Sequence, residues 1–91
     1  MPEVRFRIRW PDGSEDLCYS PSTVVREHLA AGDVHPLANF LAVSEAALSA
    51  ASRRVEARYG APCSRAAAQL KALQSKAALQ PSGAVEILSM E

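Results

Sequence analysis

Hydrophobic and charged residues alternate strictly from Glu3 to Trp10, which predicts a β-strand with one buried face and one solvated face. A Pro-Asp-Gly turn signal follows, and a second β-rich run extends from Asp16 to Ser20. The two runs therefore predict a β-hairpin. The apolar face of the first strand carries Val4, Phe6, Ile8 and Trp10, and its polar face carries an arginine row of Arg5, Arg7 and Arg9.

Two turn types fit this hairpin, and they place Cys18 differently. A two-residue turn directs Cys18 outward, beside Arg7. A three-residue turn with Gly13 as the bulge pairs Phe6 with Cys18 and directs the cysteine into the core. The proline position favours the second turn, whereas burial of the large side chains on either side of Cys18 favours the first. The register stays open at this point.

The middle of the chain has helical periodicity. A serine cap and a following proline predict a short helix from Pro21 to Ala31, and residues 32–36 are a loop by composition. One apolar stripe then predicts a long helical stretch from Leu37 to Tyr59, which Gly60 ends as a left-handed cap. Pro62 opens a third helix. The apolar stripe of this helix is Ala66, Leu70, Leu73 and Ala77.

Alternation returns from Ala84 to Met90 and predicts a final strand. The order β-β-α-α-α-β predicts an α+β fold, in which a helical layer packs on one face of a three-stranded sheet. We expect the last strand to pair beside the first, which leaves the first strand central. A length of 91 residues suits one domain, residues 1–91.

Charge narrows the classes of partner. The chain has 10 basic and 10 acidic residues, so no net charge attracts it to nucleic acid or to anionic lipid. No apolar run is long enough to span a membrane, and the N-terminal residues lack the apolar region of a secretion signal. Two distant cysteines do not form the disulfide framework of a small secreted protein. We therefore expect a cytoplasmic protein.

The arginine row is the most distinctive candidate site, because three guanidinium groups on one sheet face are able to bind a carboxylate, a phosphate or an acidic partner. The alternative is an ordinary solvated face. In that case the arginines pair across the strands with Glu15 or Asp16 and with Glu86.

Cys63 is a second candidate, because it follows Pro62 at a predicted helix N-terminus with Arg65 nearby, and both features favour a thiolate. A catalytic thiol also needs a base, and neither His28 nor His35 shows a spacing that supplies one. We therefore favour Cys63 as a packing residue. The spacing of the cysteines and histidines also argues against a metal site, and we expect no cofactor and no catalytic residue.

Residues 37–49 resemble a helix-turn-helix, with Ser44 as the cap of a recognition helix. The positions that would meet the bases offer Glu45 and alanines in place of the side chains that read base edges. Together with zero net charge, this argues against DNA binding, and Ser44 is read as a cap or kink within a helical pair.

Several strings over nearly the full length carry a family resemblance, above all Arg9-Trp10-Pro11-Asp12-Gly13-Ser14-Glu15, Cys18-Tyr19-Ser20-Pro21-Ser22 and Cys63-Ser64. With them the chain resembles a small bacterial family described as nitrogen-starvation response proteins. Members are typically encoded in a gene cluster with a nitrilase, linked to nitrile assimilation. The resemblance implies an accessory role in that pathway and brings no catalytic residue, but it draws attention to Cys18, Tyr19 and Cys63.

The leading hypothesis is a non-catalytic accessory or regulatory protein of nitrogen-starvation metabolism that binds a protein of its own pathway. The candidate surfaces are the arginine row and an exposed sheet edge, and the edge also suits a homodimer. The first alternative is a thiol-dependent small-molecule binder or enzyme that uses Cys63, with or without Cys18. The second is DNA binding through the helix from Ser44 to Arg58.

Overall fold

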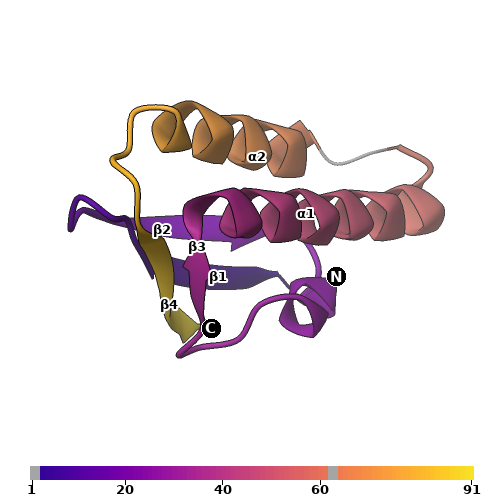
Figure 1. Cartoon of the computed structure of the whole chain (residues 1–91). Coiled ribbons are helices and arrows are strands. Elements are labelled where there is room, and N and C mark those ends of the chain that lie inside the picture. The colour runs from indigo at the N-terminus through magenta and orange to yellow at the C-terminus, as the bar shows by residue number, and fades with distance from the viewer. Residues whose placement is uncertain (1–2, 62–63) are drawn as a thin grey trace.

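The computed structural model describes residues 3–61 and 64–91. Its elements are β1 (Val4–Arg9), β2 (Glu15–Ser20), the 3₁₀ helix η1 (Thr23–Glu27), β3 (Val34–Pro36), α1 (Leu37–Tyr59), α2 (Ser64–Ala77) and β4 (Ala84–Met90). The four strands form one antiparallel sheet in the order β2-β1-β4-β3. Both α-helices cover the same face of this sheet, side by side (Figure 1). The fold is therefore α+β, with one helical layer on one sheet face.

The sheet has one strand more than the predicted three, because residues that the composition assigns to a loop form β3. This strand of three residues pairs with β4, with Val34 opposite Glu86 and Pro36 opposite Ala84. A segment this short shows no alternation from which a strand is recognised. The expected neighbours of the first strand are confirmed, since β1 lies between β2 and β4.

The first predicted helix is wrong in type and in length. A 3₁₀ helix of five residues replaces the helix expected from Pro21 to Ala31. The cap is Ser22, whose side-chain oxygen accepts a hydrogen bond from the Val24 N–H at 3.3 Å. Asp33 accepts a hydrogen bond from the Ala30 N–H at 3.0 Å, so the chain turns toward β3 where a helix would continue.

The long helical stretch is confirmed as α1, one continuous helix of 23 residues that ends at Gly60 with φ +83°. The helix-turn-helix interpretation is wrong, because Ser44 lies inside this helix and neither caps nor ends it. α2 has the predicted stripe, in which Ala66, Leu73 and Ala77 are buried. In the part of the chain that the structure describes, no helix is long and apolar enough to cross a membrane.

The hairpin adopts the three-residue turn with Gly13 as the bulge. The Trp10 carbonyl accepts a hydrogen bond from the Gly13 N–H at 2.9 Å, and Gly13 has φ +90°, which favours glycine. Phe6 consequently faces Cys18, which is buried on the helix side of the sheet. The open question of the register is settled in favour of the inward cysteine.

The core lies between the sheet and the two helices. Trp10 and Phe40 meet within it, with ring centroids 5.8 Å apart and ring planes at 79°, an edge-to-face arrangement. The remaining buried side chains come from β1, β2 and β4, from both α-helices, and from η1 and the segment after it. They include Val4, Phe6, Ile8, Cys18, Val25, Leu29, Leu48, Leu73, Val85 and Ile87.

Candidate functional site

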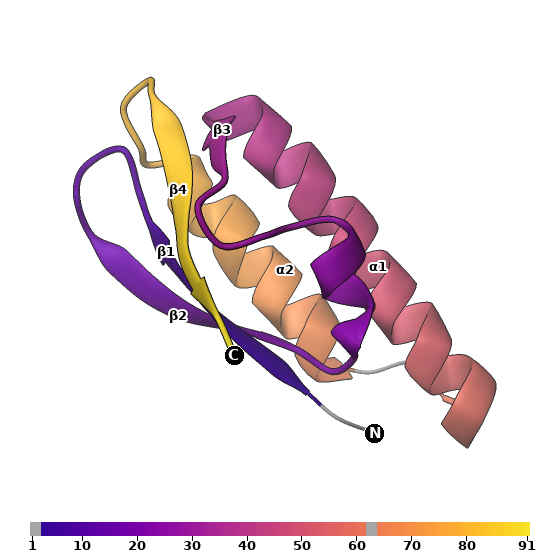
Figure 2. The same cartoon turned by 90° about the horizontal axis from the view of Figure 1, so that it is seen from below.

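The helices leave one face of the sheet open (Figure 2), and the arginine row lies on that face, because the arginines alternate with the buried side chains of β1. Alternation along β1 sends Val4, Phe6 and Ile8 into the core, so the arginines between them point the other way and are exposed. The prediction of a row on one face is confirmed. We call the open face the outer sheet face.

Two of the three arginines are paired with acidic side chains. Arg9 lies 3.3 Å from Glu15 and 3.5 Å from Glu86, the cross-strand partners expected of a solvated face. Arg5 contacts Glu3, the residue just before β1, at 3.4 Å. These pairs are half-exposed, and pairs of this kind contribute little to stability.

Arg7 differs from its neighbours, because no acidic side chain among the described residues forms an ion pair with it. Its neighbours across the sheet are Leu17 on β2 and Ser89 on β4. Leu17, on the edge strand β2, is 51% exposed. The centre of the outer sheet face therefore combines an exposed apolar side chain with a guanidinium that has no acidic partner in residues 3–61 and 64–91.

Asp16, expected as a partner of the arginines, points to the opposite side of the sheet. Its carboxylate accepts hydrogen bonds from the indole N–H of Trp10 at 2.8 Å and from Lys76 at 2.9 Å. Desolvation alone would raise the pKa of Asp16, but the hydrogen bonds from Lys76 and Trp10 and the charge of Lys76 outweigh it and hold the pKa below its usual value. Asp16 thus joins β2 to α2 and does not pair with the arginine row.

Cys18 lies in the core next to Asp16. Desolvation, helped by the negative charge of Asp16, raises the pKa of the Cys18 thiol to about 12. A thiol with this pKa is protonated at neutral pH, and the protonated form is a poor nucleophile. Cys63 lies outside the described residues, so the structure does not place it relative to Cys18.

Tyr19 stands at the free edge of β2. Its backbone N–H donates to the side-chain oxygen of Gln69 at 3.0 Å, and the guanidinium of Arg65 lies 4.0 Å from the centre of its ring. Gln69 and Arg65 both belong to α2, so this helix holds the end of the strand. The contact joins residues 50 positions apart in the chain, so no local sequence pattern predicts it.

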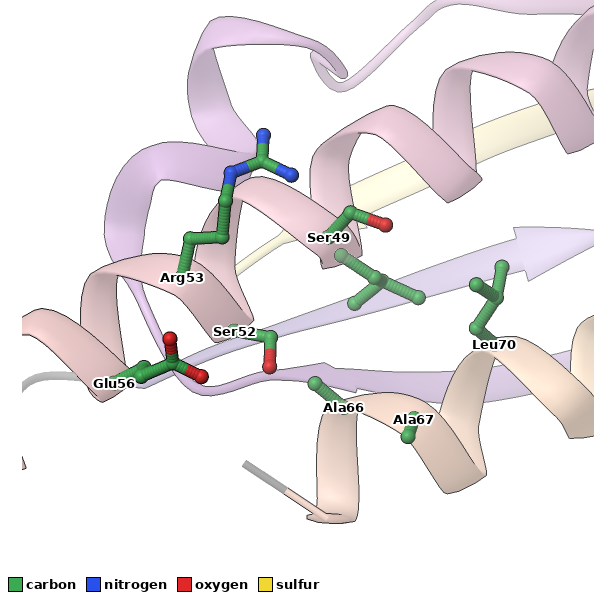
Figure 3. Close-up of a pocket in the computed structure, with 8 residues that line it drawn as sticks. Ser49, Ser52, Arg53, Glu56, Ala66, Ala67 and Leu70 are labelled. Carbon is green, nitrogen blue, oxygen red and sulfur yellow. The ribbon is translucent and has the colours of Figure 1, made fainter. Parts of the chain in front are cut away.

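Two of the hollows beside α2 have a lining relevant to ligand binding. One, of about 240 Å³, lies between β2 and α2 and is lined by Asp16, Leu17, Gln69 and Lys76 among others. The other, of about 230 Å³, lies between α1 and α2 (Figure 3). There α2 contributes Leu70 and two alanines, while the guanidinium of Arg53 points away from α2. The second hollow offers mainly apolar contact and no convergent set of polar groups.

Comparison with known proteins gives one finding. The model of the family described as "Nitrogen starvation-induced protein NitG" matches residues 5–90. Neither the curated proteins nor the solved structures contain a match to the chain. The match covers β1 through β4, and therefore includes both the outer sheet face and the contacts of β2 with α2.

Proposed function

This chain belongs to the family of nitrogen starvation-induced NitG proteins, and we propose that it is a non-catalytic accessory protein whose outer sheet face binds another protein of the same metabolism. Nitrile assimilation is the pathway we propose, in keeping with the family resemblance of the cysteine-centred strings. The cell compartment we propose is the cytoplasm.

One observation carries the proposal: Arg7 lies at the centre of an open sheet face, beside exposed Leu17, without an acidic partner in the described chain. Arginine is enriched at protein interfaces because its planar guanidinium binds a carboxylate through two hydrogen bonds and its stem packs on apolar groups. The partner that fits has a carboxylate within an otherwise apolar patch. The paired arginines on either side then belong to the polar rim.

The inward position of Cys18 supports a binding role over thiol chemistry at this site. The thiol is 1% exposed, and its pKa of about 12 keeps it protonated. Its role in this proposal is to pack against Phe6 and the helices.

The test is affinity capture from nitrogen-starved cells of the source organism, with Arg7→Glu as the key variant. We expect the native chain to retain a pathway protein in stoichiometric amount, and Arg7→Glu to reduce its recovery at least tenfold, since a charge reversal at an interface centre places like charges together. Arg54→Glu is the matched control, because Arg54 is an exposed arginine of α1, away from the outer sheet face. Equal recovery with all three proteins would refute the proposed surface.

A further inference from the structure

The two edges of the sheet are not equivalent. One edge is β3, which has three residues and ends in Pro36, a residue without a backbone N–H. A short strand with proline is a common way to prevent another strand from adding to an edge. The other edge is β2, which has six residues and no proline. Any strand that extends this sheet therefore has more backbone to pair with at β2.

Alternation along β2 identifies the backbone groups that point away from the sheet. The Tyr19 N–H points outward, since it donates to Gln69 of α2. Backbone groups of an antiparallel strand alternate in direction, so those of Leu17 and Glu15 point outward as well. Leu17 is central among the three, and no side chain of the described residues bonds its outward groups.

The helix layer leaves room beside this edge. The hollow between β2 and α2 adjoins a further hollow along the edge, lined by Tyr19, Arg65, Ala68, Gln69 and Ala72, and the two share Gln69 and Ala72. Ala68 and Ala72 are exposed small residues of α2, so the helix presents little bulk toward the edge. A strand added at β2 thus meets these two methyl groups, and the larger side chains beside them are Arg65 and Gln69.

We propose that β2 pairs with β2 of a second copy of the chain, antiparallel and in the register that places Leu17 opposite its own copy. The two four-stranded sheets then continue into one. In this register Glu15 of each copy lies opposite Tyr19 of the other, and each of the three facing pairs exchanges two backbone hydrogen bonds. The two exposed leucines cover one another at the symmetry axis.

The distribution of charge favours a second copy over an unrelated strand. β2 carries the acids Glu15 and Asp16, whereas α2 carries Arg65, Lys71 and Lys76 and no acid. In the proposed register the carboxylate of Glu15 approaches Tyr19 of the other copy, over whose ring Arg65 lies. Opposite charges therefore meet twice across the axis, once on each side.

Gln69 competes with this pairing. Its side-chain oxygen accepts a hydrogen bond from the Tyr19 N–H, with 3.0 Å between oxygen and nitrogen. The Glu15 carbonyl of a second copy would have to accept a hydrogen bond from this same N–H. Pairing therefore requires the Gln69 side chain to move aside. Replacement by alanine removes the competitor and leaves the backbone N–H of Tyr19 available to the added strand.

Light scattering of the purified full chain after size-exclusion chromatography, from micromolar to millimolar concentration, tests the proposal. We expect a mass approaching twice the 9.8 kDa of the chain. Leu17→Lys should raise the dimer dissociation constant at least tenfold, because two lysines face each other at the axis. Val34→Lys is the matched control, since Val34 is 62% exposed near the other edge, and it should leave the constant within twofold. Gln69→Ala should lower the dimer dissociation constant.

A native chain that stays monomeric at every concentration would overturn the proposal, and so would a dimer that Val34→Lys disrupts and Leu17→Lys does not. Hydrogen exchange gives a second measurement that needs no variant. The amides of Leu17 and Tyr19 should exchange more slowly as the concentration rises, and concentration-independent exchange would contradict the register. Both measurements use the isolated chain, so their failure is separate from failure of the partner-binding proposal.

Discussion

Removal of the Asp16 carboxylate tests the contact that joins the β2 edge to α2. In Asp16→Ala the indole N–H of Trp10, a residue 2% exposed, loses its acceptor at 2.8 Å, and Lys76 loses its partner at 2.9 Å. A hydrogen bond to a charged group contributes about 1.5–3 kcal/mol. The Asp16 side chain is 42% exposed, so solvent screening places the expected loss near the lower end. We expect the free energy of unfolding to fall by about 1.5 kcal/mol.

Glu15→Ala is the matched control, since Glu15 is the adjacent residue of the same strand. Its pair with Arg9 is half-exposed at 3.3 Å, and such a pair contributes about 0.5 kcal/mol or less. Urea unfolding followed by the fluorescence of Trp10 gives both values, and Trp10 is the only tryptophan in the chain. Equal losses in the two variants would refute the reasoning.

The same contact predicts a dependence on pH. The folded pKa of Asp16 lies below its unfolded value, so the carboxylate stabilises the fold above the unfolded pKa of about 3.9. This contribution is lost as the pH falls through the folded pKa. The difference in unfolding free energy between the native chain and Asp16→Ala should therefore be full at neutral pH and should shrink below about pH 4. A difference that does not change with pH would contradict the assigned charge.

Three further substitutions or probes test the core and the turn. Ser44→Ala removes a buried hydroxyl that has no hydrogen-bond partner among the described residues. We expect thermal unfolding to show that the free energy of unfolding rises by about 1 kcal/mol, and a fall in this free energy would contradict the reasoning. Cys18 should resist alkylation at neutral pH until urea unfolds the chain, as mass spectrometry of the peptides will report, and rapid labelling of the folded chain would be inconsistent with its burial. Gly13→Ala, at φ +90°, should cost about 1 kcal/mol in urea unfolding, and an unchanged midpoint would argue against the bulged turn.

Strong periodicity made much of this fold predictable from the sequence. The last strand begins and ends as expected at Ala84 and Met90, and α1 spans the predicted Leu37 to Tyr59. The hairpin was predictable but its register was not, because proline position and side-chain burial favoured different turns. The structure resolves this conflict at the sheet edge, where Leu17 remains exposed.

Contacts between distant segments explain the features that the sequence did not reveal. β3 is recognised as a strand by its pairing with β4. Asp16 faces the helices because the bulged turn places it on the same side of β2 as Cys18, and there it contacts Lys76, 60 positions away. The sequence had counted this acid as an available partner of the arginines. Alternation therefore predicted the arginine row, but it did not predict that Arg7, unlike Arg5 and Arg9, would have no acidic partner among the described residues.

Photo-crosslinking inside nitrogen-starved cells tests the central claim of partner binding most directly. A photoreactive residue placed at Ser89, which lies opposite Arg7 on the outer sheet face, reports what covers that face. The same residue at Gln74, an exposed position of α2, is the control. The account predicts a crosslink to a different protein at position 89, stronger under nitrogen starvation, and none at position 74. Absence of such a crosslink at position 89, or its presence only at position 74, would contradict it.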